Sequence, residues 1–150
     1  MSILKTKIDY TLFEKYDKEY FIENKIVPIY EDSISLKIAI CPSSNIEKIK
    51  DNFIKIINFI EEKEHDILFI LAHIEKRVNL HKSALKSISS NDDEKFTSYF
   101  LDELILYSIE QRASDIHIEK YQDLCLFKFR VDGRLRIFFS FDEELFRVFS

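Results

Sequence analysis

Apolar and polar residues alternate along three segments near the end of the chain: 114 to 119, 124 to 131 and 134 to 139. A period of two is typical of strands with one buried face. Asp132 and Gly133 separate the last two segments, and an Asp-Gly pair readily adopts the positive φ angles of a hairpin turn. The pattern therefore predicts a three-stranded antiparallel sheet.

A helical period precedes this sheet. Its apolar stripe consists of Phe96, Phe100, Leu104 and Tyr107. Asn91 followed by Glu94 is a capping signal at the start of the stripe. A helix over residues 95 to 111 is predicted, packed on one face of the sheet.

The first half of the chain mixes the two periods. Residues 11 to 24 predict a short charged helix. Residues 24 to 30 and 33 to 41 are rich in β-branched residues and predict two strands. Pro28 places the first of them at a sheet edge or at the start of a strand, because proline cannot donate a ladder hydrogen bond.

Residues 43 to 64 predict an amphipathic helix. Its apolar stripe consists of Ile46, Ile49, Phe53, Ile56, Ile57 and Ile60. Ser44 and Glu47 form a capping-box signal at its start. Residues 65 to 72 then predict a compact buried strand, and residues 73 to 88 predict a second helix.

The order of these elements predicts an α/β (α+β) protein of two small domains. Residues 1–88 would form an N-terminal α/β domain, and residues 89–95, which are polar and acidic, would form a linker. Residues 96–150 would form the second domain, a helix plus a three-stranded antiparallel sheet.

Composition narrows the class of protein. In 150 residues, 46% are hydrophobic and the formal net charge is -5, so the whole-molecule field repels nucleic acid unless a local basic patch reverses it. Cys41 and Cys125 lie far apart without a CxxC spacing, which favours buried, reduced thiols. The longest apolar run, 67 to 72, is far short of a membrane span, and no secretory signal is visible. We expect a soluble cytoplasmic protein.

The polar positions of the predicted sheet carry unusual charge. On the side opposite the helix the alternation places Asp115, His117, Glu119, Lys128, Arg130, Asp132, Arg134, Arg136 and Phe138. Four cations within nine residues could present forked donors to phosphate or to acidic groups of another domain. They could equally form cross-strand pairs with carboxylates on an ordinary solvated face. The residue pattern alone leaves both interpretations open.

No catalytic or metal site is predicted. His65, His73 and His81 are spaced by eight residues, so on a helix they point in different directions and could not share a metal ion. The chain also lacks any glycine-rich phosphate-binding loop. We therefore do not expect it to hydrolyse ATP by itself.

The segment "ASDIHIE", residues 113 to 119, followed by "FKFRVDGRL", residues 127 to 135, resembles a known pair of motifs. It is similar to the region just ahead of the nucleotide-binding core in the type II secretion and type IV pilus assembly ATPases, which usually reads G-A-S-D-I-H-I-E-P and then R-F-R-I-D-G. Three positions depart from that pattern: Arg112 replaces Gly, Lys120 replaces Pro and Lys128 replaces the first Arg.

A weaker resemblance covers the first half of the chain. Residues 21 to 53 are similar to the first N-terminal domain of these ATPases, through Pro28, Ala39, Pro42 and Asn45. The two resemblances together extend from about residue 20 to the end of the chain.

The resemblance implies a non-catalytic docking and regulatory region whose RecA-like ATPase core, with its ATP and Mg, would lie beyond Ser150. The first domain would dock on the inner-membrane platform protein, at the cytoplasmic face of that membrane. The second would pack on the core and direct Arg130 toward nucleotide phosphates, with Arg134 and Lys128 in support. The remaining motif residues would hold the sheet and its interdomain contacts: Asp115, His117, Glu119, Asp132 and Gly133.

Two alternatives remain. A small nucleic-acid-binding module would use the basic strands and stack bases on Phe127, Phe129 and Phe138, although Phe127 and Phe129 are predicted to face the helix. A cyclic-dinucleotide sensor, as carried by some relatives, would need an Arg-Leu-Gly signature early in the chain, and none occurs before residue 130.

Overall fold

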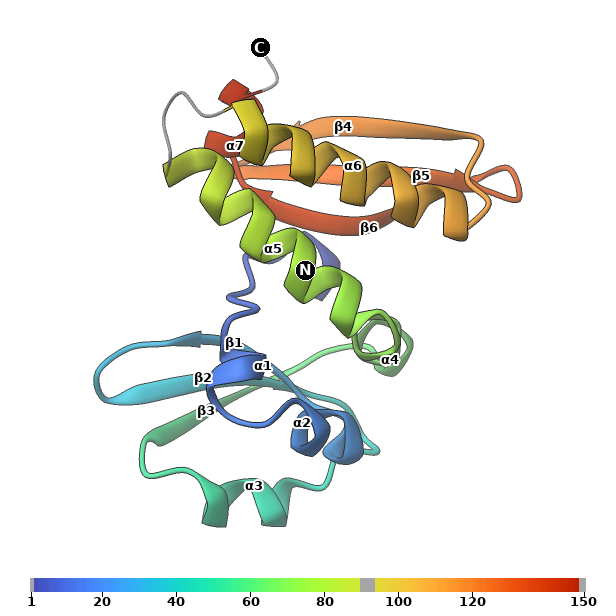
Figure 1. Cartoon of the computed structure of the whole chain (residues 1–150). Helices are drawn as coiled ribbons and strands as arrows, with labels where there is room; N and C mark the ends of the chain where they lie inside the picture. The colour runs from blue at the N-terminus through green and yellow to red at the C-terminus, as the bar shows by residue number, and fades with distance from the viewer. Residues whose placement is uncertain (1, 90–93, 149–150) are drawn as a thin grey trace. The chain divides into compact units, whose positions relative to one another are not determined.

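The computed structural model describes residues 2–89 and 94–148 (Figure 1). These residues form seven α-helices, a short 3-10 helix and two three-stranded sheets. The predicted fold class, mixed α/β with a C-terminal helix followed by an antiparallel sheet, is confirmed.

The chain divides into two compact units. The first consists of Met1–Ile3 and Ile8–Glu75, and the second of Leu4–Lys7 and Lys76–Ser150. The division thus falls near the start of a helix, about a dozen residues before the linker predicted from composition. That linker covers residues 90–93 and the capping residue Asn91, which lie outside the described part of the chain.

The first unit is built on a mixed sheet with the order β1-β2-β3. Its strands are β1 (Val27–Glu31), β2 (Ser35–Ile40) and β3 (Ile56–Glu61); β1 is antiparallel to β2, and β3 is parallel to β2. The first two strands match the prediction, and Pro28 lies on an edge strand as expected.

The prediction of one long helix over residues 43 to 64 is wrong. Helix α3 (Ile46–Asn52) ends after seven residues, and β3 follows it. The capping box does not form: the N-cap is Asn45, and the Ser44 hydroxyl instead accepts from the N–H of Cys41 and donates to the carbonyl of Lys25 at 2.6 Å. Isoleucine-rich sequence suits a strand as well as a helix, and pairing with β2 decides the outcome.

The strand predicted for residues 65 to 72 is helix α4 (Glu64–Ala72). Its buried residues Ile67, Ile70 and Leu71 follow the helical spacing, while Leu68 is exposed. A short apolar run satisfies either period, so its length and composition could not separate the two.

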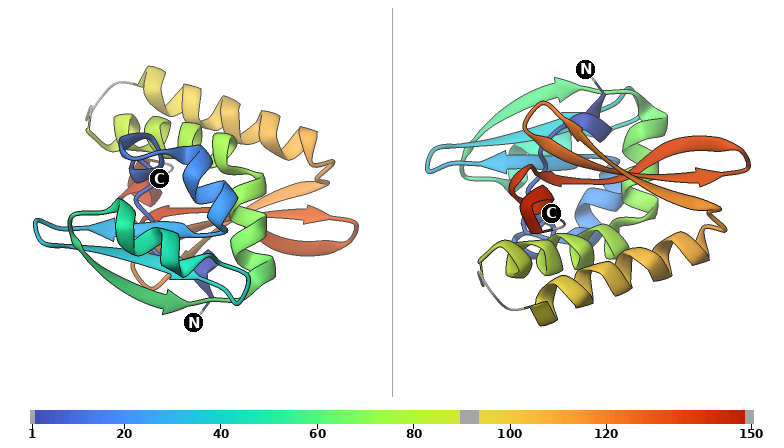
Figure 2. Two further views of the ribbon diagram at one scale, coloured as in Figure 1. Left: turned by 90° about the horizontal axis from the view of Figure 1, so that it is seen from below. Right: turned by 90° about the horizontal axis from the view of Figure 1, so that it is seen from above.

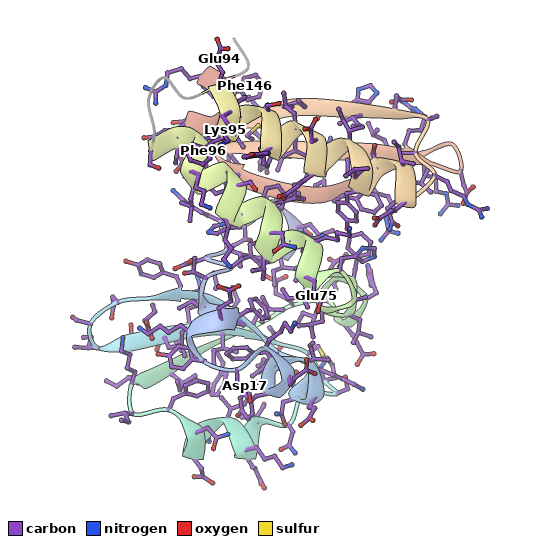
Figure 3. The ribbon with its side chains drawn as sticks, viewed as in Figure 1. Asp17, Glu75, Glu94, Lys95, Phe96 and Phe146 are labelled. Carbon is purple, nitrogen blue, oxygen red and sulfur yellow. The ribbon has the colours of Figure 1, made fainter. Side chains whose placement is uncertain are left out.

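Two short helices precede the sheet: α1 (Leu12–Lys15) and α2 (Lys18–Asn24). Asp17, labelled in Figure 3, caps α2 by accepting the backbone N–H of Glu19 at 3.1 Å. An aromatic cluster packs these helices on the segment after α3; it consists of Phe13, Tyr16, Tyr20, Phe21 and Phe53. The single charged helix predicted here is therefore broken into two.

The second unit contains the predicted helix and three-stranded sheet, but it also contains Leu4–Lys7 and most of the helix predicted over residues 73 to 88, which the sequence analysis placed in the first domain. Helices α5 (Ile74–Ser89) and α6 (Glu94–Glu110) lie side by side, as Figures 1 and 2 show, and Ser83 of α5 donates to Glu103 of α6 at 3.1 Å. The antiparallel sheet, ordered β4-β5-β6, consists of β4 (Asp115–Tyr121), β5 (Leu124–Val131) and β6 (Arg134–Asp142). A short helix, α7 (Glu144–Val148), follows.

Both cysteines are buried and free, as predicted. Burial raises the pKa of the Cys125 thiol to about 12, so this residue stays a protonated, unreactive part of the core.

Candidate functional site

The candidate site is the face of the β4-β5-β6 sheet that points away from α6. Asp115 lies opposite Arg130 in the ladder, and His117 lies opposite Lys128. Directly opposed residues point to the same side of a sheet, so these four side chains share one face. The register of β5 with β6 adds two apolar neighbours, Leu135 and Ile137. We call the following set the outer face: Asp115, His117, Glu119, Lys128, Arg130, Leu135 and Ile137.

A β-bulge in β6 changes one prediction. Phe139 lies opposite Phe127, but Ile137 lies opposite Lys128, so Phe138 is an extra residue. Beyond such a bulge, every side chain of the strand changes face relative to simple alternation. The four cations are consequently divided between the two faces of the sheet.

Arg134 and Arg136 therefore do not lie on the outer face. They pair with Val131 and Phe129, on the side that carries α6. Phe138, also expected among the charged residues, is buried and stacks on Phe129 with ring centroids 4.6 Å apart.

Opposite charges alternate across the outer face. The carboxylate of Asp115 accepts from Arg130 Nε at 3.1 Å and lies 2.5 Å from His117 Nε2. Lys128 Nζ lies 2.6 Å from the carboxylate of Glu119. The cross-strand pairing considered for an ordinary solvated face is thus present, and each of these side chains is partly exposed.

The pairing lowers the pKa of both carboxyl groups. For Glu119 the hydrogen bond from Lys128 is the main cause. For Asp115, partial desolvation raises the pKa, but hydrogen bonds from Ser114 and His117 and the charge of Arg130 outweigh it. Both groups therefore stay ionised near neutral pH and hold their basic partners in place.

Arg130 keeps part of its guanidinium available. Asp115 binds its Nε atom, the side chain is 38% exposed, and no other described residue forms a hydrogen bond or ion pair with it. An arginine has five N–H donors, four of them on the terminal nitrogens. Arg130 is thus an anchored side chain whose terminal fork can bind an anionic group.

The turn between β5 and β6 forms as predicted. Asp132 and Gly133 have φ angles of 51° and 77°, which is the type I′ pattern. Arg134 follows the turn and is exposed, without a hydrogen bond or ion pair to any described residue. Its charge lies at the tip of the hairpin, on the opposite side from Arg130.

The aromatic residues of this sheet are not available for stacking on bases. Phe127 and Phe129 are fully buried, and they contact Phe100 and Tyr107 of α6 with ring centroids 5.4 and 5.3 Å apart. Base stacking needs exposed rings beside cations. The arrangement of the phenylalanines therefore does not suit the nucleic-acid-binding alternative.

Arg112 occupies a backbone position that suits glycine. Its φ angle is 58°. Its N–H donates to the carbonyl of Ile109 and that of Ala113 donates to the carbonyl of Ser108, both at 2.9 Å. These two bonds form the Schellman motif that ends α6, in which the left-handed residue is usually glycine. The departure from the family pattern thus falls where glycine has a physical advantage.

Replacing Arg112 with glycine is expected to stabilise the chain by about 0.5–1 kcal/mol. A left-handed conformation costs a non-glycine residue roughly 1–2 kcal/mol, and part of that gain is lost to the greater freedom of glycine in the unfolded chain. Chemical denaturation monitored by circular dichroism measures the change. Arg112→Ala, which keeps the strain, is the control, and equal stability of the two variants would contradict the explanation.

The described residues include no group of three or more His, Cys, Asp or Glu side chains that could hold a metal ion. None of the helices in that part of the chain is long and apolar enough to cross a membrane.

In comparisons with known proteins, no family model matches the chain, and no curated protein matches it significantly. The family assignment stays a proposal that rests on the two motifs and on the geometry of the outer face.

Two features of this sheet and the helix before it were not predicted from the sequence: the β-bulge at Phe138 and the positive φ angle of Arg112. The bulge had a visible signal in the sequence. The adjacent apolar residues Phe138 and Phe139 interrupt the alternation, as expected for a β-bulge. The placement of Leu135 and Ile137 on the outer face follows from that bulge. The positive φ angle of Arg112 had no signal in the residue itself.

Proposed function

We propose that this chain is the non-catalytic docking and regulatory region of a type II secretion or type IV pilus assembly ATPase. It links the motor to the inner-membrane platform protein and works at the cytoplasmic face of that membrane. The ATPase core of the parent protein, with its ATP and Mg, supplies the catalysis.

The observation that supports this most is the state of Arg130. It belongs to the motif "FRVDG", it is anchored through Nε by Asp115 of the motif "ASDIHIE", and its terminal fork is left for another group. A guanidinium fork matches the geometry of phosphate or carboxylate. The two motifs thus act together, one presenting the arginine and the other orienting it.

The outer face also has the composition of a surface that meets another domain. Leu135 and Ile137 are half-buried beside the charged pairs of β4 and β5. An apolar strip beside polar groups of both signs is typical of contacts between domains that separate and rejoin. The second unit would use this face to pack on the ATPase core and bring Arg130 close to the nucleotide.

The test adds the full chain to the RecA-like core of a secretion or pilus ATPase from the same genome. We expect the chain to raise ATP turnover by the core, and Arg130→Ala to reduce that stimulation by at least about tenfold, since loss of a charged donor to a phosphoryl group costs at least that much. Arg134→Ala and Lys128→Ala should have smaller effects, because Arg134 lies on the other face and Lys128 is occupied by Glu119.

Lys120→Ala is the matched control, because this exposed cation lies on β4 but pairs with Cys125 in the ladder, on the side of the helix. Turnover that is stimulated equally by the native chain and by Arg130→Ala would contradict the phosphate-facing role. Absence of any stimulation or binding by the native chain would contradict the proposed family.

A further inference from the structure

In the described part of the first unit, one side of strand β3 is unpaired. Strand β3 lies at the margin of the sheet (Figure 2), and in the described residues β2 is its one partner. The N–H of Ile56 donates to the carbonyl of Ile34, just before β2, and the N–H of Glu62, just past β3, donates to the carbonyl of Ile40 in β2. Alternate residues of a strand direct their backbone groups to opposite sides. The N–H and C=O groups of Ile57, Phe59 and Glu61 therefore point outward.

This edge lacks the usual protection against pairing. From Ile56 to Ile60 it contains no proline, no charged residue and no bulge, and no described helix forms a hydrogen bond to these residues; charges occur only at its ends, at Lys55 and Glu61. Natural edge strands normally carry at least one such device, because free backbone groups beside apolar side chains attract another strand. The side chains of Ile54 and Ile56 are both strongly exposed, with Ile56 at 65%.

The strand is complementary to itself when it is read in the opposite direction. In the sequence "KIINFIE", residues 55 to 61, the residues equidistant from Asn58 match. Ile57 matches Phe59, Ile56 matches Ile60 and Lys55 matches Glu61. A two-fold axis at Asn58 would therefore place apolar opposite apolar and cation opposite anion.

The hydrogen-bonding pattern selects the same register. In an antiparallel pair, the residues whose backbone groups face the partner must lie opposite one another. With the axis at Asn58, the outward-facing Ile57 lies opposite Phe59 of the second copy, which also faces outward. Asn58 and its symmetry mate then form a close pair without backbone hydrogen bonds. Backbone geometry and side-chain pairing thus agree.

We propose that two copies of this chain associate through β3, antiparallel and centred on Asn58, so that their sheets form one continuous six-stranded sheet. The proposal concerns the first unit and does not depend on the ATPase assignment. A second copy fits this edge because the same seven residues supply both halves of every pair.

The ends of the strand contribute the charge complementarity. Lys55 Nζ donates to the carbonyl of Asp32 at 2.6 Å and lies 3.2 Å from Glu31, which uses two of its three donors. The third can reach Glu61 of the second copy. Glu61 is exposed and forms no ion pair with any described residue. The symmetric dimer contains this contact twice.

The test measures the mass of the full chain by sedimentation equilibrium over a range of concentrations. The native chain should form a dimer. Ile57→Pro should make it monomeric, because proline removes an outward N–H without removing a bond to β2. Asn58→Lys and Asn58→Asp should each raise the dimer dissociation constant by at least about tenfold, since each places like charges directly opposite one another at the axis.

An equimolar mixture of Asn58→Lys and Asn58→Asp should restore the dimer, because opposite charges then meet at the axis. Ser98→Lys, on α6 of the second unit, introduces the same charge elsewhere and should dimerise like the native chain. Circular dichroism confirms that each variant is folded. A native chain that stays monomeric overturns the proposal, and so does a mixture that stays monomeric or a folded Ile57→Pro variant that dimerises normally. Binding of a foreign strand peptide by a monomeric native chain would also overturn it.

Discussion

Replacing Phe129 with alanine is expected to destabilise the second unit by about 3–5 kcal/mol. The side chain is fully buried and lies against Phe138 and Tyr107, with ring centroids 4.6 and 5.3 Å away. Truncation removes its apolar contacts and leaves a cavity between α6 and the sheet, and losses of this size are usual for buried phenylalanine. Unfolding in urea, monitored by circular dichroism, measures the effect.

Tyr99→Ala provides the control for that measurement. Tyr99 lies on α6, the helix that packs on Phe129, but its side chain is 50% exposed, so its removal should cost less than about 1 kcal/mol. Comparable losses for the two variants would show that the core between α6 and the sheet is not packed as described. Phe129→Leu, which keeps most of the apolar volume, should recover more than half of the lost stability.

Replacing Glu31 with alanine is expected to destabilise the first unit by about 1–3 kcal/mol. The Glu31 side chain is 8% exposed; it pairs with Lys15 and Lys55 and accepts a hydrogen bond from the hydroxyl of Tyr16. Removing Glu31 leaves the partly buried hydroxyl of Tyr16 without its acceptor, whereas Lys15 is 56% exposed and Lys55 keeps its bond to the carbonyl of Asp32. Glu75→Ala is the control, because its pair with Lys18 is exposed and should contribute little.

The contribution of Glu31 to the free energy of unfolding should depend on pH. Burial raises the pKa of this carboxyl, but hydrogen bonds from Lys15 and Lys55 outweigh the burial, and the net shift is downward. A carboxyl with a lowered folded-state pKa stabilises the protein fully above its unfolded pKa, about 4.3, and loses that contribution as pH falls through the folded value.

Unfolding of the native chain and of Glu31→Ala should therefore be compared from pH 7 downward. The difference in the free energy of unfolding is expected to be constant near neutral pH and to shrink in the acid range below about pH 4. A difference that grows as pH falls would mean that the pKa of Glu31 is raised and that Lys15 and Lys55 do not stabilise its ionised form.

The second sheet was accessible to sequence reasoning because its signals are local. The alternation of β4 and β5 and the turn at Asp132 and Gly133 each depend on neighbouring residues, and all three formed as predicted. The first unit was less accessible. Residues 44 to 72 are rich in isoleucine and satisfy both periods, and the choice between helix and strand depended on pairing with β2, far away in the chain.

In the candidate site, too, some residues lie where local patterns predict and others do not. Arg130 and Asp115 were selected from motifs, and the ladder places them opposite one another. Arg134 was assigned to the same face by alternation, but one extra residue in β6 puts it on the other. A bulge changes the face of every residue beyond it, and this one lets the adjacent Phe138 and Phe139 both be buried against the aromatic residues beneath α6.

By itself the sequence determined the mixed α/β class, the helix and three strands of the second unit, and the residues of the charged motif. Periodicity and turn preferences depend on residues close together in the chain, so they can be recognised without knowledge of the fold. Only the tertiary structure decided where α3 gives way to β3, which cations share a face with Asp115, and that the edge of β3 is open. Each of these depends on which distant strand or helix lies alongside, because backbone pairing and burial are set by contacts that local patterns do not encode.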